Sequence, residues 1–307
     1  MNLGYACINS TLSDVKPKKL AVTTNRTMRK ATFQKEGIKL SSELALQNVK
    51  DLLTIVKWNE ANNIKFFRIS SEIFPWASEY DILDLPDIQE ISKYLKQVGD
   101  YCTENNQRLT TQPGPFNKLC SPQENVVKNT VKDLENHGVL FDLMGFEPSH
   151  WNKINIHVGA SYGGKYDETA KTFCESFDLL SDSVKKRLTV ENDDKKSLWS
   201  TKRLYEQIYS QINIPIVHDL HHHLFCHDEQ PQEEALTLAV STWGDVKPVV
   251  HYSQSRREEH NDQKIKENAH SDSYWILPEL YGQNVDVMLE CKHKEIGLFK
   301  IKQMLGE

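Results

Sequence analysis

Residues 214–226 read IPIVHDLHHHLFC, a run of apolar and β-branched residues that passes into one aspartate and four histidines. The first part, residues 214–219, has the length and the Val and Ile content of a buried β-strand. Imidazole and carboxylate groups at the end of such a strand indicate that the strand delivers them to a site. The stretch therefore predicts a buried sheet with chemistry at one of its edges.

Runs of the same kind recur along the chain, and each is followed by a longer segment of helical character. The eight predicted strands are 2–8, 65–70, 108–112, 154–159, 187–192, 214–219, 248–253 and 286–291. Strands that alternate with helices indicate parallel βαβ units. Eight such units in 307 residues predict an α/β fold, a single closed (β/α)₈ TIM barrel that occupies residues 1–307 as one domain.

The segments between the strands support this prediction. In residues 42–59, apolar side chains recur at helical spacing behind Ser41 and Ser42, two possible N-caps. Further helices are predicted at 87–106, 124–138, 167–180, 199–211 and 295–305. The chain contains no repeat, low-complexity tract or linker that would divide it.

Composition limits the possible function classes. The net charge of −6 gives no overall basic footprint, but residues 15–40 carry eight basic residues against one acid. No segment approaches the ~20 apolar residues of a membrane helix, and the amino end does not resemble a signal peptide. Six scattered cysteines without a CxxC pair fit reduced thiols. We expect a soluble, intracellular protein, in either the cytoplasm or the nucleus.

Polar residues stand at or just past the carboxyl end of each predicted strand. They are Tyr5, Asn9, Glu72 or Glu79, Gln112, His157, Glu191, Asp219, His222, His251 and Glu290. In a barrel, all of these converge on the face that carries the active site. Carboxylates and imidazoles that converge in this way suit divalent ions such as Mn²⁺ or Zn²⁺. We therefore predict a metal cluster at the carboxyl-terminal face.

A single buried histidine is more often structural than a metal ligand, so the prediction rests on the coincidence of several such residues. Glu191 carries the most weight, because it ends a buried run where an unpaired charge is costly. The three-residue step from Asp219 to His222 puts both side chains on one side of a tight turn, whereas His218 should face the other side of its strand.

One enzyme class fits part of this pattern of residues. A sugar isomerase or epimerase holds a single metal ion, for which Glu191, Asp219, His251 and Glu290 would be sufficient ligands. Such a one-metal site does not need His222 or His270.

The sequence resembles the ultraviolet damage endonuclease family over most of its length. The motifs that carry the resemblance are LGYACINSTL, TTNRTMRKATF, FFRISSEIFPWAS, RLTTQPGPF, IHVGASYGGK, RLTVENDD, IPIVHDLHHH, VHYSQS, AHSDSYW and DVMLECKHKE. Ordered matches at every strand end are far more specific than any one of them. The resemblance implies a (β/α)₈ barrel that holds a cluster of divalent ions, usually Mn²⁺.

The resemblance also implies roles for particular residues. Glu191 would bridge an ion held by His157 to a second ion, and His222 with His270 would hold a third. The implied ligands of the second ion are Asp219, His251 and Glu290. Tyr5 and Asn9 match family positions near the scissile phosphate and the lesion, which makes them and Glu191 the catalytic candidates. Arg26, Arg29 and Phe116 are the implied DNA contacts.

The implied chemistry is metal-assisted hydrolysis of a phosphodiester. The substrate would be double-stranded DNA, cut 5′ of a UV photoproduct or an abasic site. Two or three ions would take part, and the protein would act as a monomer without a membrane or an obligate partner.

The sequence departs from the family pattern inside the predicted site. Glu79 stands where the family has a histidine ligand, and a carboxylate can still bind Mn²⁺. Gln112 replaces a second ligand histidine, and its amide oxygen is a weaker ligand. Pro115 replaces a glutamine that, with the aromatic at Phe116, probes the duplex at the lesion. A modified lysine of the family corresponds to Val249.

Lys247 lies on the same face of its strand as His251 but about 13 Å away at ~3.3 Å per residue, too far to replace that lysine. The substitutions at Gln112 and Val249 leave a third hypothesis open. In it, the chain binds lesions but has lost turnover.

Overall fold

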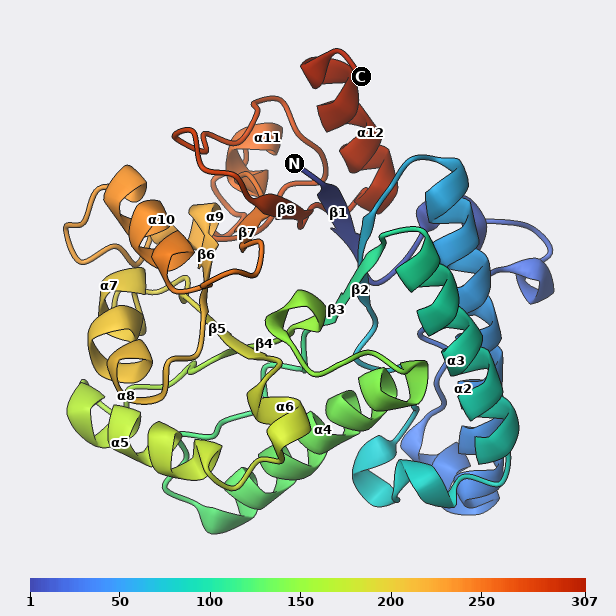
Figure 1. The fold of residues 1–307 in the computed structure, drawn as a ribbon. Helices are drawn as coiled ribbons and strands as arrows, with labels where there is room; N and C mark the ends of the chain where they lie inside the picture. Colours follow the sequence, from blue (N-terminus) through green and yellow to red (C-terminus); the bar gives the residue numbers. More distant parts are fainter.

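The computed structural model describes residues 1–307 and forms a closed barrel of eight parallel strands in the order of the sequence (Figure 1). The strands are β1 Leu3–Ala6, β2 Phe66–Ile69, β3 Arg108–Thr111, β4 Ile154–His157, β5 Leu188–Glu191, β6 Ile216–Asp219, β7 Val249–Tyr252 and β8 Asp286–Leu289. Each falls inside a predicted strand, so the predicted TIM barrel is confirmed. Pairing of β1 with β8, with Leu3 opposite Val287, closes the barrel.

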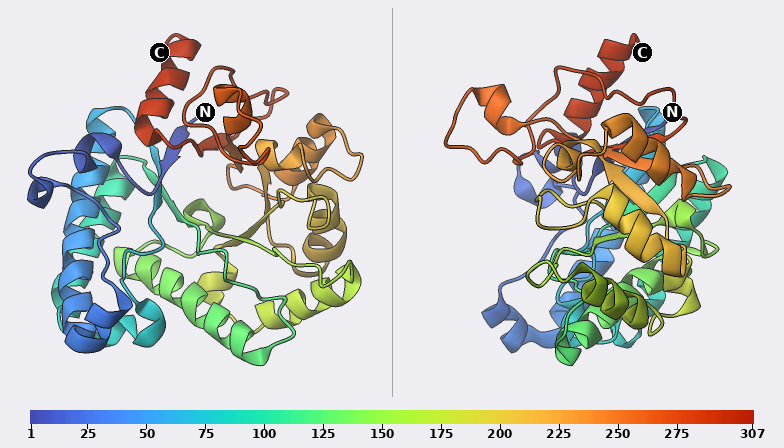
Figure 2. Two further views of the ribbon diagram at one scale, coloured as in Figure 1. Left: turned by 180° about the vertical axis from the view of Figure 1, so that it is seen from behind. Right: turned by 90° about the vertical axis from the view of Figure 1, so that its left-hand side faces the viewer.

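Helices and turns cover the outside of the barrel, as the views in Figure 2 show. The α-helices are α1 Ser10–Ser13, α2 Lys30–Ala61, α3 Ile88–Glu104, α4 Glu124–Met144, α5 Tyr166–Phe177, α6 Asp182–Lys185, α7 Thr201–Leu204, α8 Ser210–Ile212, α9 Leu220–His223, α10 Gln232–Ser241, α11 Arg256–His260 and α12 Lys294–Leu305. The short turns are η1 Lys18–Leu20, η2 Ala77–Glu79, η3 Ile82–Asp84, η4 His150–Asn152 and the π-helical η5 Tyr205–Tyr209. None of these helices is both long and apolar enough to cross a membrane.

The predicted start of the second helix was wrong. α2 begins at Lys30, and Ser41 and Ser42 lie buried inside it. Gly37, at φ 63°, kinks the helix, because glycine adopts this left-handed conformation without a steric cost. Instead of capping α2, the Ser42 hydroxyl donates to Asp87 Oδ2 (2.7 Å) at the start of α3.

The main core lies between the outer faces of the strands and the helices. A second, smaller cluster fills the barrel interior and includes Phe66, Val217, Val249 and Met288. Buried ionic groups lie toward both ends of the barrel, on either side of this apolar cluster.

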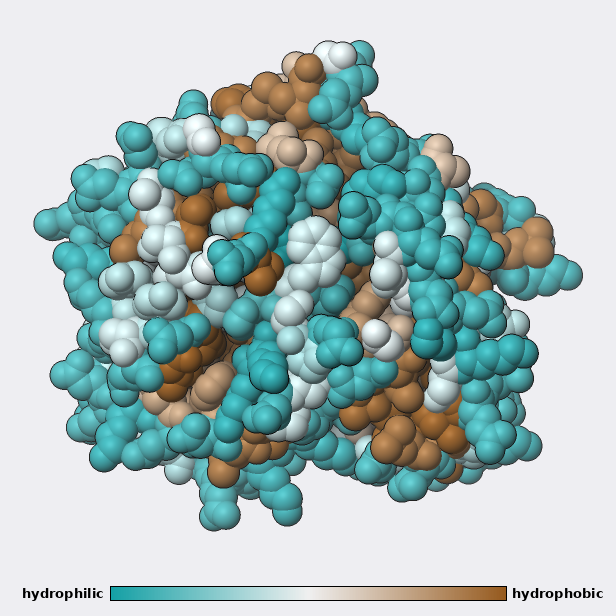
Figure 3. Space-filling model, viewed as in Figure 1, coloured by the Kyte–Doolittle hydropathy of each residue, from teal (hydrophilic) through white to brown (hydrophobic).

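The surface in the view of Figure 3 is mostly hydrophilic with scattered hydrophobic patches.

A buried ionic network occupies the amino-terminal end of the barrel. Arg108 and Asp286, both fully buried, are joined at 3.3 Å. The Arg108 guanidinium also donates to the carbonyl oxygens of Trp151 (2.8 Å) and Lys247 (2.9 Å). Lys247 Nζ lies 3.0 Å from Asp286 Oδ1. Lys247 is therefore committed to this end, which agrees with the prediction that it lies too far from His251 to act there.

Candidate metal centre

Two pairs of neighbouring strands bring the predicted ligands together at the carboxyl-terminal end of the barrel. In the parallel register of β4 and β5, His157 lies opposite Glu191, and in that of β6 and β7, Asp219 lies opposite His251. Each of these residues ends its strand or lies next to its end, so the side chains converge at the barrel mouth. Strand pairing thus places an imidazole beside a carboxylate twice.

Glu191 lies at the centre of the cluster and is fully buried. Its Oε2 accepts hydrogen bonds from Asn155 Nδ2 (2.5 Å) and Gln112 Nε2 (3.2 Å). Its Oε1 lies 3.1 Å from His251 Nδ1. The two amides fill the acceptor sites of Oε2, whereas Oε1 keeps a free lone pair. The carboxylate could bridge two cations if one of these amides gave up its hydrogen bond.

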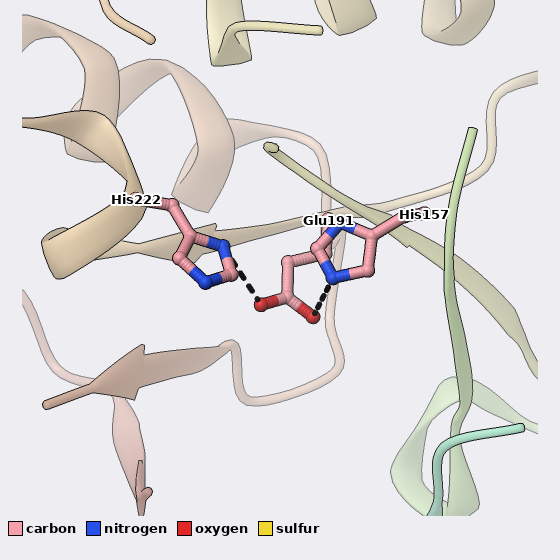
Figure 4. Close-up of side chains that lie close together, drawn as sticks. All are labelled: His157, Glu191 and His222. Atoms are coloured by element: carbon pink, nitrogen blue, oxygen red, sulfur yellow. Dashed lines mark ion pairs between the residues drawn. The ribbon is translucent and has the colours of Figure 1, made fainter. Parts of the chain in front are cut away.

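The first group of potential ligands comprises His157, Glu191 and His222, whose ligand atoms all lie within 4.8 Å of one another. Figure 4 shows the two imidazoles on either side of the Glu191 carboxylate, one facing each oxygen. His157 Nε2 is 3.4 Å from Oε2, and His222 Nδ1 is 3.5 Å from Oε1. Imidazole nitrogen and carboxylate oxygen are ligand types that suit a borderline divalent ion.

The second group shares Glu191 and adds Asp219 and His251. Asp219 caps helix α9, since its Oδ1 accepts from the backbone N–H groups of His221 and His222, each at 2.8 Å. Its other oxygen, Oδ2, is buried and has no hydrogen-bond partner. A buried, unpartnered carboxylate oxygen is costly, and a divalent cation would satisfy it.

Neighbouring residues orient the imidazoles toward the carboxylates. His222 Nδ1 lies 2.9 Å from the carbonyl oxygen of Asn192 and therefore donates to it. Its Nε2, which lies 3.9 Å from Asp219 Oδ2, is then left with a lone pair for a cation. His157 Nδ1 lies 3.4 Å from Asp193 Oδ1. Our sequence interpretation missed Asp193, although its place two residues after Glu191 was a possible signal.

Glu290, directly after β8, joins the cluster from the other side. Its Oε1 is 3.2 Å from His251 Nδ1 and forms an ion pair with Arg68, a largely buried residue of β2 that the sequence interpretation also missed. The carbonyl oxygen of Glu290 accepts from His270 Nδ1 (3.1 Å). The His270 ring lies 5.6 Å from that of His222, so His270 is at the rim of the cluster.

Gln112 spans the position between two charged groups. Its Oε1 accepts from Arg68 and its Nε2 donates to Glu191. In this arrangement the amide oxygen, the only atom of Gln112 able to bind a metal, is already used by a guanidinium.

Lys153, just before β4, is a further charged residue that the sequence interpretation missed. The side chain is fully buried, and its Nζ lies 3.3 Å from His251 Nε2. Burial lowers the pKa of the Lys153 amine well below its usual range, against the opposing effect of Glu191. Val249 packs lower in the barrel, in the apolar interior cluster.

The charge balance of the cluster favours cations. Burial disfavours the ionised form of Glu191, yet His251 and His157 hold the pKa of this carboxyl below its usual range. Burial also opposes the protonation of His157, but Glu191 and Asp193 raise its pKa to about 10. A proton on His157 thus stabilises the carboxylates in the absence of a metal, and a divalent ion would compete with that proton.

Other histidines of the quoted stretch lie away from this centre. His218 faces outward from the barrel, as predicted, and its Nδ1 is 2.9 Å from Thr201 Oγ1. Burial lowers the pKa of His218 to about 3. His223 Nε2 donates to the carbonyl oxygen of Gln230 (3.0 Å).

Three predicted site residues do not join the cluster. Tyr5 is fully buried, and its hydroxyl turns outward from the barrel to donate to Asn59 Oδ1 of α2 (2.7 Å). Asn9 is also buried. Its Nδ2 donates to the Tyr5 hydroxyl (2.9 Å), and its Oδ1 caps α1. Glu79 ends the η2 turn at the surface. The expectation that these side chains face the barrel mouth is therefore corrected.

The predicted DNA contacts differ in how accessible they are. Arg26 is tied down by Asp51 Oδ2 (2.6 Å) and the carbonyl oxygen of Thr23 (2.7 Å), which makes it a structural clamp. Arg29 is exposed at the N-cap of α2. Phe116 is 88% exposed on the loop between β3 and α4. Arg29 and Phe116 therefore expose their side chains to a binding partner, whereas Arg26 does not.

Comparison with known proteins identifies similar sequences. A family model described as UV-endonuclease UvdE matches residues 1–307. The UV-damage endonuclease of Schizosaccharomyces pombe is 34% identical over 312 residues, which are 97% of this chain and 50% of that protein. The UV DNA damage endonuclease of Clostridium perfringens is 32% identical over 315 residues, which are 100% of this chain and 71% of that protein. The chain thus spans half the length of the S. pombe relative.

Two solved structures resemble the barrel to different degrees. SacUVDE matches with a TM-score of 0.83 at 31% identity, over 100% of this chain and 98% of that chain. The 3-keto-D-glucoside 4-epimerase YcjR from E. coli matches with a TM-score of 0.53 at 12% identity, over 85% of this chain and 95% of that chain. At 12% identity, the second match indicates a common fold and nothing more.

Proposed function

The chain belongs to the UV-endonuclease UvdE family, and we propose that it is a DNA-repair endonuclease. Its reaction would be hydrolysis of the phosphodiester 5′ of a UV photoproduct or an abasic site in duplex DNA. The observation that carries the proposal is the position of Glu191, which belongs to both potential ligand groups at the barrel mouth. Two neighbouring cation sites that share a carboxylate are an arrangement that can support metal-assisted phosphodiester hydrolysis.

We propose Mn²⁺ as the metal. His157, Glu191 and His222 would hold one ion, and Glu191, Asp219, His251 and Glu290 a second, with His270 at the rim. When bound, such ions supply an activated water and neutralise charge on the phosphate. The unpartnered Asp219 Oδ2 and the mixed nitrogen and oxygen donors support the fit.

The residues around the ligands have roles of their own. Asn155 fixes the Glu191 carboxylate, and the amide groups at the start of α9 fix that of Asp219. Arg68 balances the charge of Glu290 inside the barrel. These contacts hold the donor atoms in place before any ion arrives, which lowers the cost of reorganisation during the reaction.

The number of ions is proposed to be two. The third ion that the resemblance implies would use His222 and His270, but His222 belongs to the first ligand group here and His270 lies at the rim of the cluster. On the β3 side, the Gln112 amide is held between Arg68 and Glu191, so it adds no free ligand. Glu79 lies at the surface and offers no replacement ligand.

The alternatives have less support. A sugar epimerase would share only the fold, because the epimerase match is 12% identical. A protein that binds lesions without cutting DNA is the other alternative. It is supported by Gln112 and Val249, which replace a ligand histidine and a modified lysine of the family. The intact Glu191 centre favours the nuclease over it.

We propose further that residues 1–307 work as one barrel domain, as a monomer and inside the cell, on damaged double-stranded DNA. The exposed Phe116 and Arg29 are the proposed contacts to base and phosphate.

The test is a nicking assay with purified protein, Mn²⁺ and labelled duplexes that carry a photoproduct, an abasic site or no lesion. Incision directly 5′ of the lesion, lost in Glu191→Gln, would support the nuclease. Tight binding to damaged DNA without incision, in protein that retains its metal, would contradict it in favour of the lesion binder.

A further inference from the structure

One lysine at the barrel mouth has no partner of opposite charge. Lys118 lies on the loop between β3 and α4, two residues after Phe116, and its side chain is half-buried. The lysine ion pairs of the structure involve other residues and do not include Lys118. Its Nζ also forms no hydrogen bond, although its backbone N–H donates to Thr130 Oγ1 (2.9 Å). The loop is thus anchored to α4, while the Lys118 ammonium has no partner within the chain and is available to a ligand.

The Lys118 ammonium lies over the backbone of Gly159, two residues after β4. A Cβ atom added to Gly159 would overlap Lys118 Nζ and would lie 3.6 Å from His157 Cβ. Gly159 has φ +66°, a conformation that other residues rarely adopt. The ammonium therefore occupies the space beside a proposed metal ligand.

Lys118 faces a cavity of about 250 Å³ that adjoins the metal centre. His157 and His222 form one wall, and Asp193 and Asp194 also line the cavity. Both acids have other partners. Asp193 accepts from the backbone N–H of Trp199 (3.2 Å) and lies against His157, and Asp194 accepts from Asn268.

A second cation, Lys195, reaches the same cavity from the loop after β5. The cavity therefore combines two lysines with a wall of metal-binding groups. An anion is the ligand that would fit between these lysines and the wall formed by His157 and His222, were that wall to hold a cation.

We propose that Lys118 binds a non-bridging oxygen of the DNA backbone where the strand enters this cavity. The inference rests on the proposed endonuclease function, and it names a phosphate contact additional to Arg29. A lysine acts on phosphate as a compact point charge and needs no base-specific geometry. Lys118 would therefore strengthen the binding of any strand positioned at the metal centre.

The test is the salt dependence of duplex binding in the presence of EDTA, so that the DNA stays intact. Each lost phosphate contact lowers the slope of log K against log salt by about 0.9, which corresponds to about eightfold weaker binding at about 0.1 M salt. Lys118→Met should show both changes, and Lys118→Arg should restore the wild-type slope. Lys118→Gln provides a second neutral variant if the Met variant does not fold.

Lys186 offers a matched control, because it is exposed just before β5, at the opposite end of the barrel, and no ion pair in the structure includes it. Lys186→Met removes the same charge and should leave the slope unchanged. An unchanged slope in folded Lys118→Met or Lys118→Gln, with normal salt-dependent binding by the wild type, would overturn this inference alone. If the wild type shows no salt-dependent binding to duplex DNA, both this inference and the proposed function fail.

Discussion

The two ends of the barrel interior both contain buried charges, but they differ in whether those charges are satisfied. At the amino-terminal end, Arg108, Asp286 and Lys247 satisfy one another, and none of their side-chain nitrogen or oxygen atoms is left buried without a partner. At the carboxyl-terminal end, the buried Asp219 Oδ2 has no hydrogen-bond partner. Buried charged groups that find all their partners within the chain are structural. Buried charged groups that lack a partner mark a site where a ligand supplies the missing contact.

The largest effect is expected from a change to one carboxylate at the carboxyl-terminal end of the barrel, which carries the proposed metal centre. Asp219→Asn keeps a side-chain oxygen to cap α9 but removes charge from the unpartnered position. Loss of a residue that only hydrogen-bonds to a metal ligand lowers activity by roughly 10- to 100-fold. Loss of a ligand itself should lower the incision rate by more than this. The free energy of unfolding of the metal-free protein should not fall, because the lost oxygen had no partner. Marked destabilisation in urea would show that Asp219 is structural.

The opposite result is expected at the amino-terminal end. Arg108→Met leaves the buried Asp286 with Lys247 as its remaining cationic partner, and breaking a buried ion pair costs about 3 to 5 kcal/mol. Urea unfolding should report this loss, whereas the metal content of the folded fraction should stay at the wild-type value. Metal loss without destabilisation would contradict the separation of the two ends.

Asp193→Asn tests how far the functional end extends beyond its ligands. The Asp193 carboxylate lies against His157 Nδ1, and residues in that position fix the ring and increase its basicity. Metal affinity should drop by about 10- to 100-fold, measured by isothermal titration with Mn²⁺. Unchanged affinity would limit Asp193 to its hydrogen bond with Trp199.

The pH dependence follows from His157, whose folded pKa of about 10 exceeds its usual value of 6.5. In the metal-free protein, the stabilisation from protonated His157 is complete below about 6.5 and is lost as the pH rises through about 10. Mn²⁺ must displace this proton, so its affinity should increase with pH, by up to about tenfold per unit. Titrations at pH values between 6.5 and 9 measure this slope, and a flat profile would exclude His157 as a ligand.

The smallest expected effect is an increase in the number of metal ions bound per chain. Gln112→His places an imidazole where an amide now bridges Arg68 and Glu191, and we expect a third ion to bind weakly. Metal content per chain at increasing Mn²⁺ concentration measures it, with the wild type as the control. A wild type that already binds three ions would contradict the proposed count of two.

The sequence was sufficient to predict the barrel, because strand length, β-branched content and regular spacing are local signals. The ligands at strand ends followed from the same logic, since parallel strands bring their carboxyl ends to one face. Tyr5 was misplaced because alternation along a short strand does not reveal which face is the interior. Arg68 and Lys153 were missed because nothing local distinguishes a lysine or arginine that turns inward from one that turns to solvent. Arg26 was taken for a DNA contact because its partner, Asp51, lies on a different element.

Closure of the barrel by β1 and β8 also determines when the site can exist. The pairing of Leu3 with Val287 joins segments from opposite ends of the chain, and such distant contacts form late and slowly during folding. Glu290 follows directly on β8, so the second proposed ion site gains its last carboxylate only when the final strand docks. During synthesis, a growing chain would expose His157 and Glu191 long before Glu290 is available, and tight metal binding would coincide with the end of folding.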